Sequence, residues 1–272
     1  AHVVRQHSLR HRLMIFNLPL EQLYALISHY FLVMVRISAL LHVAPVFSEK
    51  TISARLRAAL ALTLALLLGG LVSDADIGLY SWAGVWTMAK QVLIGAAMGL
   101  TMQLLFAAVR LAGEIIGMQM GLSFATFFDP GSGNSPVIAR LLNMLAMLLF
   151  LVFNGHLWLL SLLAETFEAL PINSEPLHAG GMFYLVNHAG LIFSQGLILG
   201  LPVIALLLSI NMVLALLNRL TPQLSIFVVG FPLTLTFGML ALLLIDETLA
   251  PFFERLMSHG FEILSGLLQA LV

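Results

Sequence analysis

The sequence is dominated by long runs without a single Asp, Glu, Lys or Arg. Residues 141–164 form one such run. As a helix it would be about 36 Å long, because each helical residue adds about 1.5 Å. The hydrocarbon core of a bilayer is about 30 Å thick, so this run is long enough to cross it. Two more uncharged runs cover residues 176–218 and 224–245. The runs predict an integral membrane protein made of several helices.

The low content of charged residues makes a soluble fold a poor alternative. Only 9% of the 272 residues are charged, against about 25% in an average soluble domain. The chain has no cysteine, which excludes disulfides, thiolate metal sites and cysteine nucleophiles. Its net charge of -1 argues against binding to nucleic acid, which needs a basic surface. We therefore expect membrane lipid around the protein and no nucleic acid partner.

The chain is expected to have two main parts after a short leader. Residues 1–13 are basic and histidine-bearing, and we expect them to be a non-native leader or a misassigned start ahead of Met14. Residues 14–170 form a predicted N-terminal helical region. Pro171 and Asn173 end its last apolar run. Residues 171–272 are predicted to form a helical hairpin and a tail helix.

The predicted hairpin is marked by the polar stretch between its two uncharged runs. Its tip is expected to carry Arg219, Pro222 and Gln223, a cation followed by a helix breaker. The tail from Phe252 to Val272 contains more charges than the hairpin. We expect it to be an amphipathic helix or one that contacts another subunit.

Glycines spaced by four residues recur in the apolar runs. This spacing places small residues on one helix face, where it lets two helices approach closely in a membrane. The alternative is chance, because apolar helices are rich in glycine. The predicted packing glycines are Gly95 and Gly99, then Gly113, Gly117 and Gly121, and a further pair, Gly196 and Gly200.

Residues 121–136, GLSFATFFDPGSGNSP, combine helix-breaking residues with three phenylalanines. Irregular backbone at membrane depth is tolerated only where protein buries it or where it lines a cavity. The stretch is therefore either a pore-closing loop or an ordinary interfacial loop with Phe at the headgroups. The residues alone favour the interfacial loop. Ser135 and Pro136 predict the N-cap and the first residue of the next helix.

Several charges interrupt the apolar runs. Arg36, Lys90, Arg110 and Glu114 lie within or beside them, and a charge at the bilayer centre costs a few kcal/mol, about 3 on permissive scales. Such groups normally face protein, water or the interface. We therefore expect other subunits to bury much of this chain. A separate basic cluster of Lys50, Arg55 and Arg57 favours the cytoplasmic side for its loop.

No pattern indicates catalysis. The sequence contains no HExxH, P-loop, dinucleotide fingerprint or nucleophile elbow, so no catalytic residue, metal ligand or cofactor is predicted. His156 could titrate inside a helix bundle, but a hydrogen-bonded packing histidine is the favoured interpretation. A secondary transporter is the main alternative function. It would use Lys90, Arg110 and Glu114 near the membrane midplane, yet no convincing internal repeat is present.

Four stretches resemble a known family. Residues 117–133 (GMQMGLSFATFFDPGSG), 140–163, 218–235 and 44–60 are similar to the FliR/SctT family of flagellar and type III secretion export-gate membrane proteins. FNGHLW and PQLSIFVVGFPL are specific parts of the match. The resemblance extends over residues 14–272 and is strongest to the flagellar branch.

The resemblance implies an all-α subunit of a helical hetero-oligomer at the entrance of the export channel. Its N-terminal part would be FliP-like and its C-terminal part FliQ-like. Its partners would be FliP-type and FliQ-type subunits, a larger export-apparatus membrane protein and exported unfolded polypeptides. The complex would lie in the bacterial inner membrane at the flagellar basal body, with part projecting toward the periplasm. The implied pore plug consists of Phe124, Thr126, Phe127, Phe128, Asp129, Pro130 and Gly131.

Overall fold

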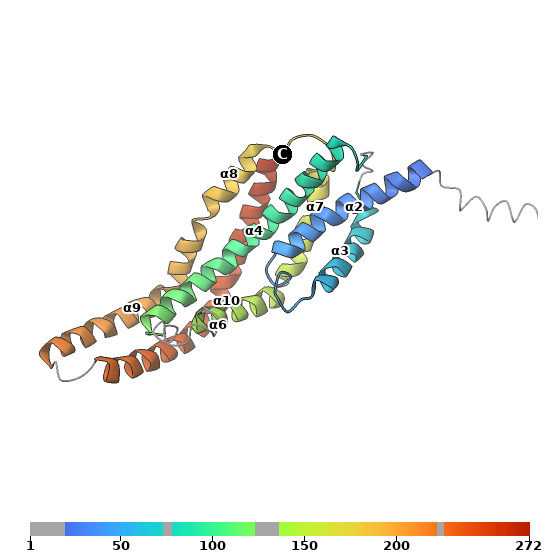
Figure 1. The fold of residues 1–272 in the computed structure, drawn as a ribbon. Helices are drawn as coiled ribbons and strands as arrows, with labels where there is room; N and C mark the ends of the chain where they lie inside the picture. Colours follow the sequence, from blue (N-terminus) through green and yellow to red (C-terminus); the bar gives the residue numbers. More distant parts are fainter. Residues whose placement is uncertain (1–19, 73–77, 123–135, 222–225) are drawn as a thin grey trace, which may run out of the picture.

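The computed structural model describes residues 20–72, 78–122, 136–221 and 226–272. The predicted leader, residues 1–13, lies outside these ranges. Within them every regular element is an α-helix (Figure 1). The all-α fold predicted from the sequence is therefore confirmed.

Eight helices follow one another in the described part of the chain. They are α2 (Leu20–Val43), α3 (Ala54–Gly69), α4 (Trp82–Gln119), α6 (Val137–Val152), α7 (Gly155–Ala169), α8 (Ala179–His188), α9 (Leu191–Leu220) and α10 (Ile226–Leu271).

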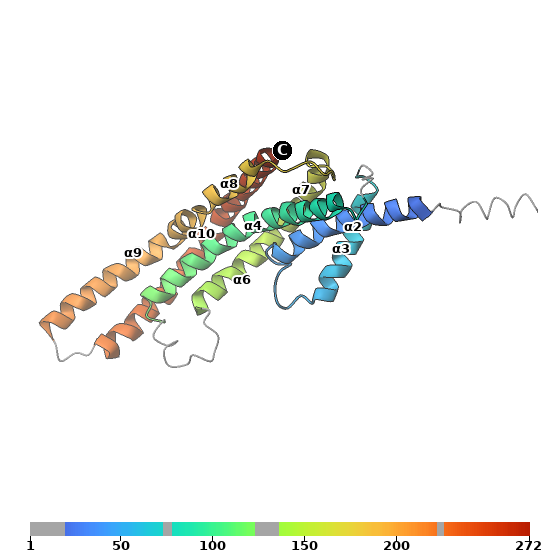
Figure 2. The ribbon, with the colours of Figure 1, turned by 45° about the horizontal axis from the view of Figure 1, so that its top comes forward.

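The long helix α4 is the centre of the bundle. Helix α2 packs along its first half, α6 packs against its second half, and α9 also lies along it (Figures 1 and 2). Helix α3 covers α2 from the outside. The rings of Phe106, Phe150 and Phe253 meet in the core, with the Phe106 centroid 5.7 Å from Phe150 and 5.8 Å from Phe253. The regions before and after residue 171 therefore share one core.

Helix α4 runs through the charged position Arg110 without interruption. Arg110 separates two apolar runs in the sequence, but the structure joins them into one helix from Trp82 to Gln119. Arginine is a good helix former, and backbone hydrogen bonds do not depend on side-chain charge. With 38 residues, the helix is about 57 Å long, nearly twice the thickness of a hydrocarbon core. Helix α4 is therefore longer than one crossing of the hydrocarbon core requires.

The run at 141–164, expected to be long enough to cross a membrane, does not form one straight helix. Helices α6 and α7 meet there at an angle of 64°. Asn154 adopts the left-handed conformation at φ 57°, which asparagine tolerates better than most residues. A Cβ on Gly155 would lie 2.5 Å from the ring of Phe150, so glycine permits the tight bend. Helix α6 begins at Val137 with Pro136 as its N-cap, one residue later than predicted.

Helices α9 and α10 run side by side in opposite directions (Figures 1 and 2). Helix α10 then continues into the tail through a bend of 65° between Gly230–Leu243 and Thr248–Leu271. Pro251 accounts for the bend, because proline cannot donate to the carbonyl four residues earlier. Three helical segments of the described chain are long and apolar enough to cross a membrane, or up to five with each bent pair taken as one span.

Candidate functional site

The end of α4 is the point from which the chain enters residues 121–136. Gly121 has φ 81° and ends the helix in a left-handed conformation. The amide of Leu122 donates to the Gly117 carbonyl at 3.1 Å, and the amide of Gly121 donates to the Met118 carbonyl at 3.0 Å. This pair of bonds is a Schellman motif, which satisfies two of the last carbonyls of the helix. Gly121 was predicted to pack helices together. In the structure it follows the last residue of α4 and terminates the helix.

The next two carbonyls of α4 are bound by side chains from the C-terminal hairpin. Asn211 of α9 donates through Nδ2 to the Gln119 carbonyl and to Gln119 Oε1, each at 3.3 Å. The hydroxyl of Thr234 on α10 lies 3.3 Å from the Met120 carbonyl and 3.1 Å from the Phe231 carbonyl, so it shares one proton between them. Met120 is fully buried, and water does not compete there. We call these bonds the Asn211–Thr234 contact.

A glycine of α10 lets the two helices come this close. A Cβ on Gly238 would lie 2.5 Å from Met120 Cγ. The motifs predicted from the sequence do not include Gly238, Asn211 or Thr234. In the sequence, Asn211 and Thr234 differ from their neighbours only as isolated polar residues in apolar runs. This does not predict a contact between helices, because many such residues bond only to their own helix.

The predicted plug and hairpin tip lie mostly outside the described residues. This holds for Phe124, Thr126, Phe127, Phe128, Asp129, Pro130 and Gly131, and for Pro222 and Gln223. Arg219 is described. It is exposed in the last turn of α9.

The predicted packing glycines lie at three different helix contacts. Gly95 and Gly99 face α2, since a Cβ at Gly95 would lie 2.3 Å from the Arg36 carbonyl. Gly113 faces α6, where a Cβ would lie 2.4 Å from Ala139 Cα. Gly196 on α9 faces α4, and a Cβ there would lie 2.8 Å from the Ala108 carbonyl. These contacts attach α2, α6 and α9 to different stretches of α4.

Gly113 and Gly117 share one face of α4, yet their surroundings differ. The nearest atom to a Cβ at Gly117 would be 3.8 Å away, an ordinary contact. We therefore expect Gly113→Ala to destabilise the protein by about 1–3 kcal/mol through overpacking. Gly117→Ala should leave stability unchanged or raise it, because alanine favours helix by about 1 kcal/mol. Thermal unfolding in detergent, followed by tryptophan fluorescence, would compare the variants, and equal midpoints would refute this assignment.

Arg36 forms a fully buried polar centre. Its side chain is 0% exposed. It donates through Nε to Gln91 Oε1 at 2.7 Å, through Nη1 to the Thr166 carbonyl at 2.8 Å and through Nη2 to the Leu170 carbonyl at 2.7 Å. Its Cζ lies 4.2 Å from the centroid of the Phe167 ring. Arg36 therefore ties the C-terminal end of α7 to α2 and α4.

Lys90 extends this polar centre along α4. It is 5% exposed and donates to the side-chain oxygen of Asn173 and, at 3.1 Å, to the Glu175 carbonyl. Within the described residues neither Arg36 nor Lys90 forms a salt bridge with a carboxylate, and the one basic–acidic contact there joins His259 Nδ1 and Glu262 Oε2 at 3.5 Å. Carbonyl and amide dipoles, including those at the α7 terminus, thus stabilise the positive charges of Arg36 and Lys90.

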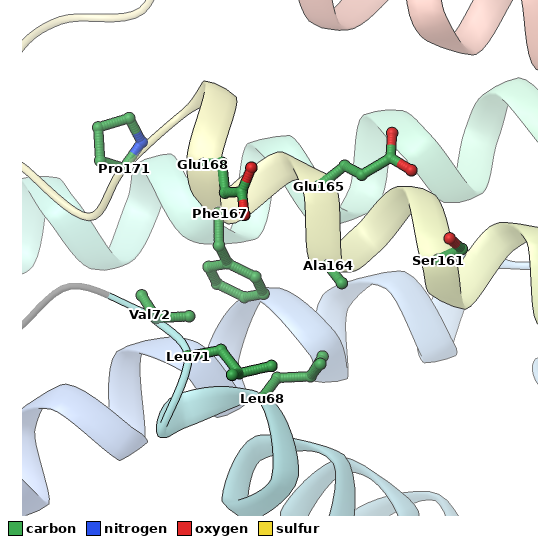
Figure 3. Close-up of a pocket in the computed structure, with 9 residues that line it drawn as sticks. All are labelled: Leu68, Leu71, Val72, Ser161, Ala164, Glu165, Phe167, Glu168 and Pro171. Atoms are coloured by element: carbon green, nitrogen blue, oxygen red, sulfur yellow. The ribbon is translucent and has the colours of Figure 1, made fainter.

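A cavity of about 250 Å³ borders the Arg36 centre. Phe167 points from α7 toward Leu71 and Val72, which follow α3 (Figure 3). Glu165 and Glu168 lie at its edge and are exposed. The cavity separates the end of α3 from α7, and Arg36 lies against the ring of Phe167.

The ionisable residues that a transporter would use are not gathered together. Lys90 binds Asn173 near one end of α4, whereas Arg110 and Glu114 are half-buried some twenty residues later. At about 1.5 Å per residue the separation is about 30 Å. Among the described residues, no group of three His, Asp or Glu is placed to hold a metal ion. His156 is half-buried, and its Nδ1 has no hydrogen-bond partner in this part of the chain.

The free end of α9 exposes apolar side chains on nearly all sides. No residue from 208 to 221 is buried. More than half of the surface of Leu208, Met212, Val213, Leu216 and Leu220 is exposed. Exposed apolar surface of this extent marks contact with lipid or with another protein.

Comparison with known proteins gives a consistent result. Residues 27–260 match the family described as "Bacterial export proteins, family 1". A "Flagellar biosynthetic protein FliR" from Escherichia coli K12 is 48% identical over 252 residues, which cover 92% of this chain and 97% of that protein. The protein of the same name from Pectobacterium carotovorum is 50% identical over 246 residues, which cover 90% of this chain and 94% of that protein. The protein of this name from Bacillus subtilis is 27% identical, over 88% of this chain and 94% of that protein.

Proposed function

Because the chain belongs to the FliR family of bacterial export proteins, we propose that it is a subunit of the export gate of the flagellum. It is a membrane protein of flagellar protein export. In our proposal it forms part of the channel entrance in the inner membrane at the flagellar basal body. Unfolded polypeptides pass through this entrance.

The proposal that the chain assembles with other subunits rests on the exposed apolar surface of α9. From residue 208 onward α9 makes too few contacts within the chain to bury its side chains. FliP-type and FliQ-type subunits would cover part of this surface, and lipid or a larger export-apparatus membrane protein would cover the rest. In this arrangement the region 14–170 is FliP-like and the region 171–272 is FliQ-like. The hairpin of α9 and α10 would be the FliQ-like element.

The length of α4 supports a position partly outside the bilayer. A helix of about 57 Å exceeds the hydrocarbon core by about 27 Å. We propose that this excess projects toward the periplasm. Helices that leave the bilayer with apolar surfaces require sister subunits around them, which agrees with a packed hetero-oligomer.

The plug is proposed to consist of the seven residues from Phe124 to Gly131 named above. Phenylalanine side chains at a constriction exclude water, and a dewetted constriction blocks ions. The described residues support this role indirectly, because the preceding Schellman turn and the Asn211–Thr234 contact fix where the chain leaves α4. The protein would act as a passive conduit, and other proteins would supply energy.

Gentle detergent purification of the tagged chain from its native cells tests the assembly. We expect it to elute with two smaller hydrophobic subunits in one complex that survives size-exclusion chromatography. As a control, the same tag on an unrelated multi-pass membrane protein should not retain them. A chain that elutes alone, and that carries a small solute across liposomes, would refute the proposal and support a transporter.

A further inference from the structure

A groove between the first turns of α9 and the second half of α10 has a polar wall and an apolar wall. The two helices pack against each other (Figures 1 and 2). The volume of the groove is about 280 Å³, and its lining residues are Gln195, Ile198, Phe252, Arg255, Leu256 and His259. Pockets for drug-sized ligands measure about 300–1,000 Å³. The groove therefore suits a small head group whose remaining atoms lie outside it.

Arg255 supplies the permanent charge of the polar wall. Its side chain is exposed, and Nε donates to the Pro251 carbonyl at 3.2 Å. Among the described residues its two Nη atoms have no protein acceptor, so they are available to a ligand. A guanidinium binds phosphate oxygens through two parallel hydrogen bonds. Gln195, which is half-buried on α9, adds an amide donor from the opposite helix.

Carboxylates near the groove leave the charge of Arg255 available. None of the six lining residues is acidic. Glu262 lies 3.5 Å from His259 Nδ1, but it follows Arg255 by seven residues, which is about 10 Å along a helix. Glu254 precedes Arg255 directly, so its side chain points about 100° away. Helix α9 contributes no charge from residue 191 to 218. The groove therefore favours an anion over a cation.

The apolar wall continues along α9 as a strip of exposed side chains. Ile198, Leu201, Leu208 and Met212 are 57%, 59%, 57% and 67% exposed, and Ala205 between them is also exposed. Their spacing of three and four residues places them on one face of the helix. The strip is about 21 Å long. Half of a hydrocarbon core measures about 15 Å, so the strip can accompany an acyl chain from the groove to the bilayer centre.

The groove also lies at a suitable height for a lipid head group. Arg219, which is exposed in the last turn of α9, follows Ile198 by 21 residues, or about 32 Å. This distance matches the hydrocarbon core of about 30 Å. Helix α9 belongs to a segment that is long and apolar enough to cross a membrane. With Arg219 at one interface, the groove lies at the other, where phosphate groups are.

We propose that this groove binds one phospholipid, with its phosphate between Arg255 and Gln195 and an acyl chain along the α9 strip. The site is built from one chain and needs neither a partner subunit nor the plug. It therefore goes beyond the proposed function, and a failure of the export-gate proposal would leave it standing.

Native mass spectrometry of the full chain, with any subunits that stay bound, tests the ligand class. The protein is delipidated in detergent and then mixed with dioleoylphosphatidylglycerol, dioleoylglycerol or inorganic phosphate at one concentration. We expect one phosphatidylglycerol per chain to be retained, because this lipid alone supplies both phosphate and acyl chains. Equal retention of dioleoylglycerol would overturn the role of the phosphate. Equal retention of inorganic phosphate would overturn the role of the strip.

Matched variants test the position of the site. Arg255→Gln and Gln195→Leu should each lower phosphatidylglycerol retention about five- to tenfold, the effect of one lost hydrogen bond to a charged phosphate. Arg140→Gln is the control, because Arg140 is an exposed arginine on α6, away from the groove. It should retain the lipid like the unchanged chain. Equal losses in Arg255→Gln and Arg140→Gln would show an unspecific charge effect and overturn the site.

A photoreactive lipid tests the same site by a measurement that does not depend on retention. Phosphatidylglycerol with a diazirine in one acyl chain should label α9 between Ile198 and Met212, and Arg255→Gln should abolish this labelling. Leu26 and Ile27 on α2 are 46% and 56% exposed and provide the comparison surface. If α2 and α9 are labelled equally, and Arg255→Gln changes neither, the lipid coats the protein without a specific site and the proposal is wrong.

Discussion

Replacing Arg36 by methionine should destabilise the protein by about 3 kcal/mol or more, the largest effect we expect from a single substitution outside the plug. The guanidinium binds two buried carbonyls and Gln91 Oε1. Without it these three acceptors lose a charged donor in a site that water does not reach. Each buried acceptor without a partner costs about 1–3 kcal/mol. Methionine has a similar volume, so the loss would come from hydrogen bonding rather than from a large cavity.

Thermal unfolding of the detergent-solubilised protein would measure the effect. A loss of about 3 kcal/mol should lower the midpoint by about 6–12 °C for a chain of this size. Arg255→Met is the matched control, because Arg255 is exposed and, among the described residues, donates only to the Pro251 carbonyl of its own helix. It should change stability by at most about 0.5 kcal/mol. If the two variants unfold at the same temperature, Arg36 does not have this role.

A second change at the same site would distinguish lost hydrogen bonds from lost packing. In the Arg36→Met background, Gln91→Leu removes one of the stranded acceptors. It also removes Gln91 Nε2, which is buried and has no partner among the described residues. The double variant should therefore unfold at a higher temperature than Arg36→Met alone. A further loss would mean that the packing of Gln91 matters more than its hydrogen bonds.

Replacing Phe124, Phe127 and Phe128 together by alanine should make the membrane leaky to small ions. The three rings are proposed to close the channel by excluding water, and alanine is too small to fill the same constriction. The expected result is a severalfold faster collapse of an imposed potential, read with a potential-sensitive dye in cells that contain the full complex. Replacement by leucine should keep most of the seal, because leucine is also large and apolar.

The control for this prediction is a set of phenylalanines on other surfaces. Phe183, Phe193 and Phe237 are 69%, 64% and 43% exposed and lie on α8, α9 and α10. Their replacement by alanine removes the same number of rings but leaves the plug loop intact. Tight membranes with the control set and leaky ones with the plug set would support the plug. Normal tightness in both would refute it.

The bend at Asn154 shows that a long hydrophobic run does not establish one straight helix. The stretch 141–164 has the length and composition of a single span, but composition does not encode a turn of two residues. Asn154 and Gly155 were visible in the sequence as residues that permit unusual backbone. Only packing against Phe150 determines that the chain uses that freedom there.

The glycine pattern was a better guide, although not to the partners. Spacing identified small residues on α4, yet it could not say that Gly95 meets α2 while Gly113 meets α6. Gly117 has the same spacing and no close neighbour. The space around a glycine depends on a second helix, and one sequence segment contains no information about its distance.

The sequence by itself determined two properties, the lipid surroundings of the protein and its fold class. Few charges and long apolar runs favour membrane-spanning helices, in which every backbone hydrogen bond is made within the segment, and the motifs add the resemblance to the export family. The tertiary structure alone decided which polar groups meet. Arg36 reaches residues 130 and more positions away in Thr166 and Leu170, and Asn211 reaches Gln119. The physical reason is that a buried polar atom needs a partner within about 3 Å, and distance along the chain does not specify distance in space.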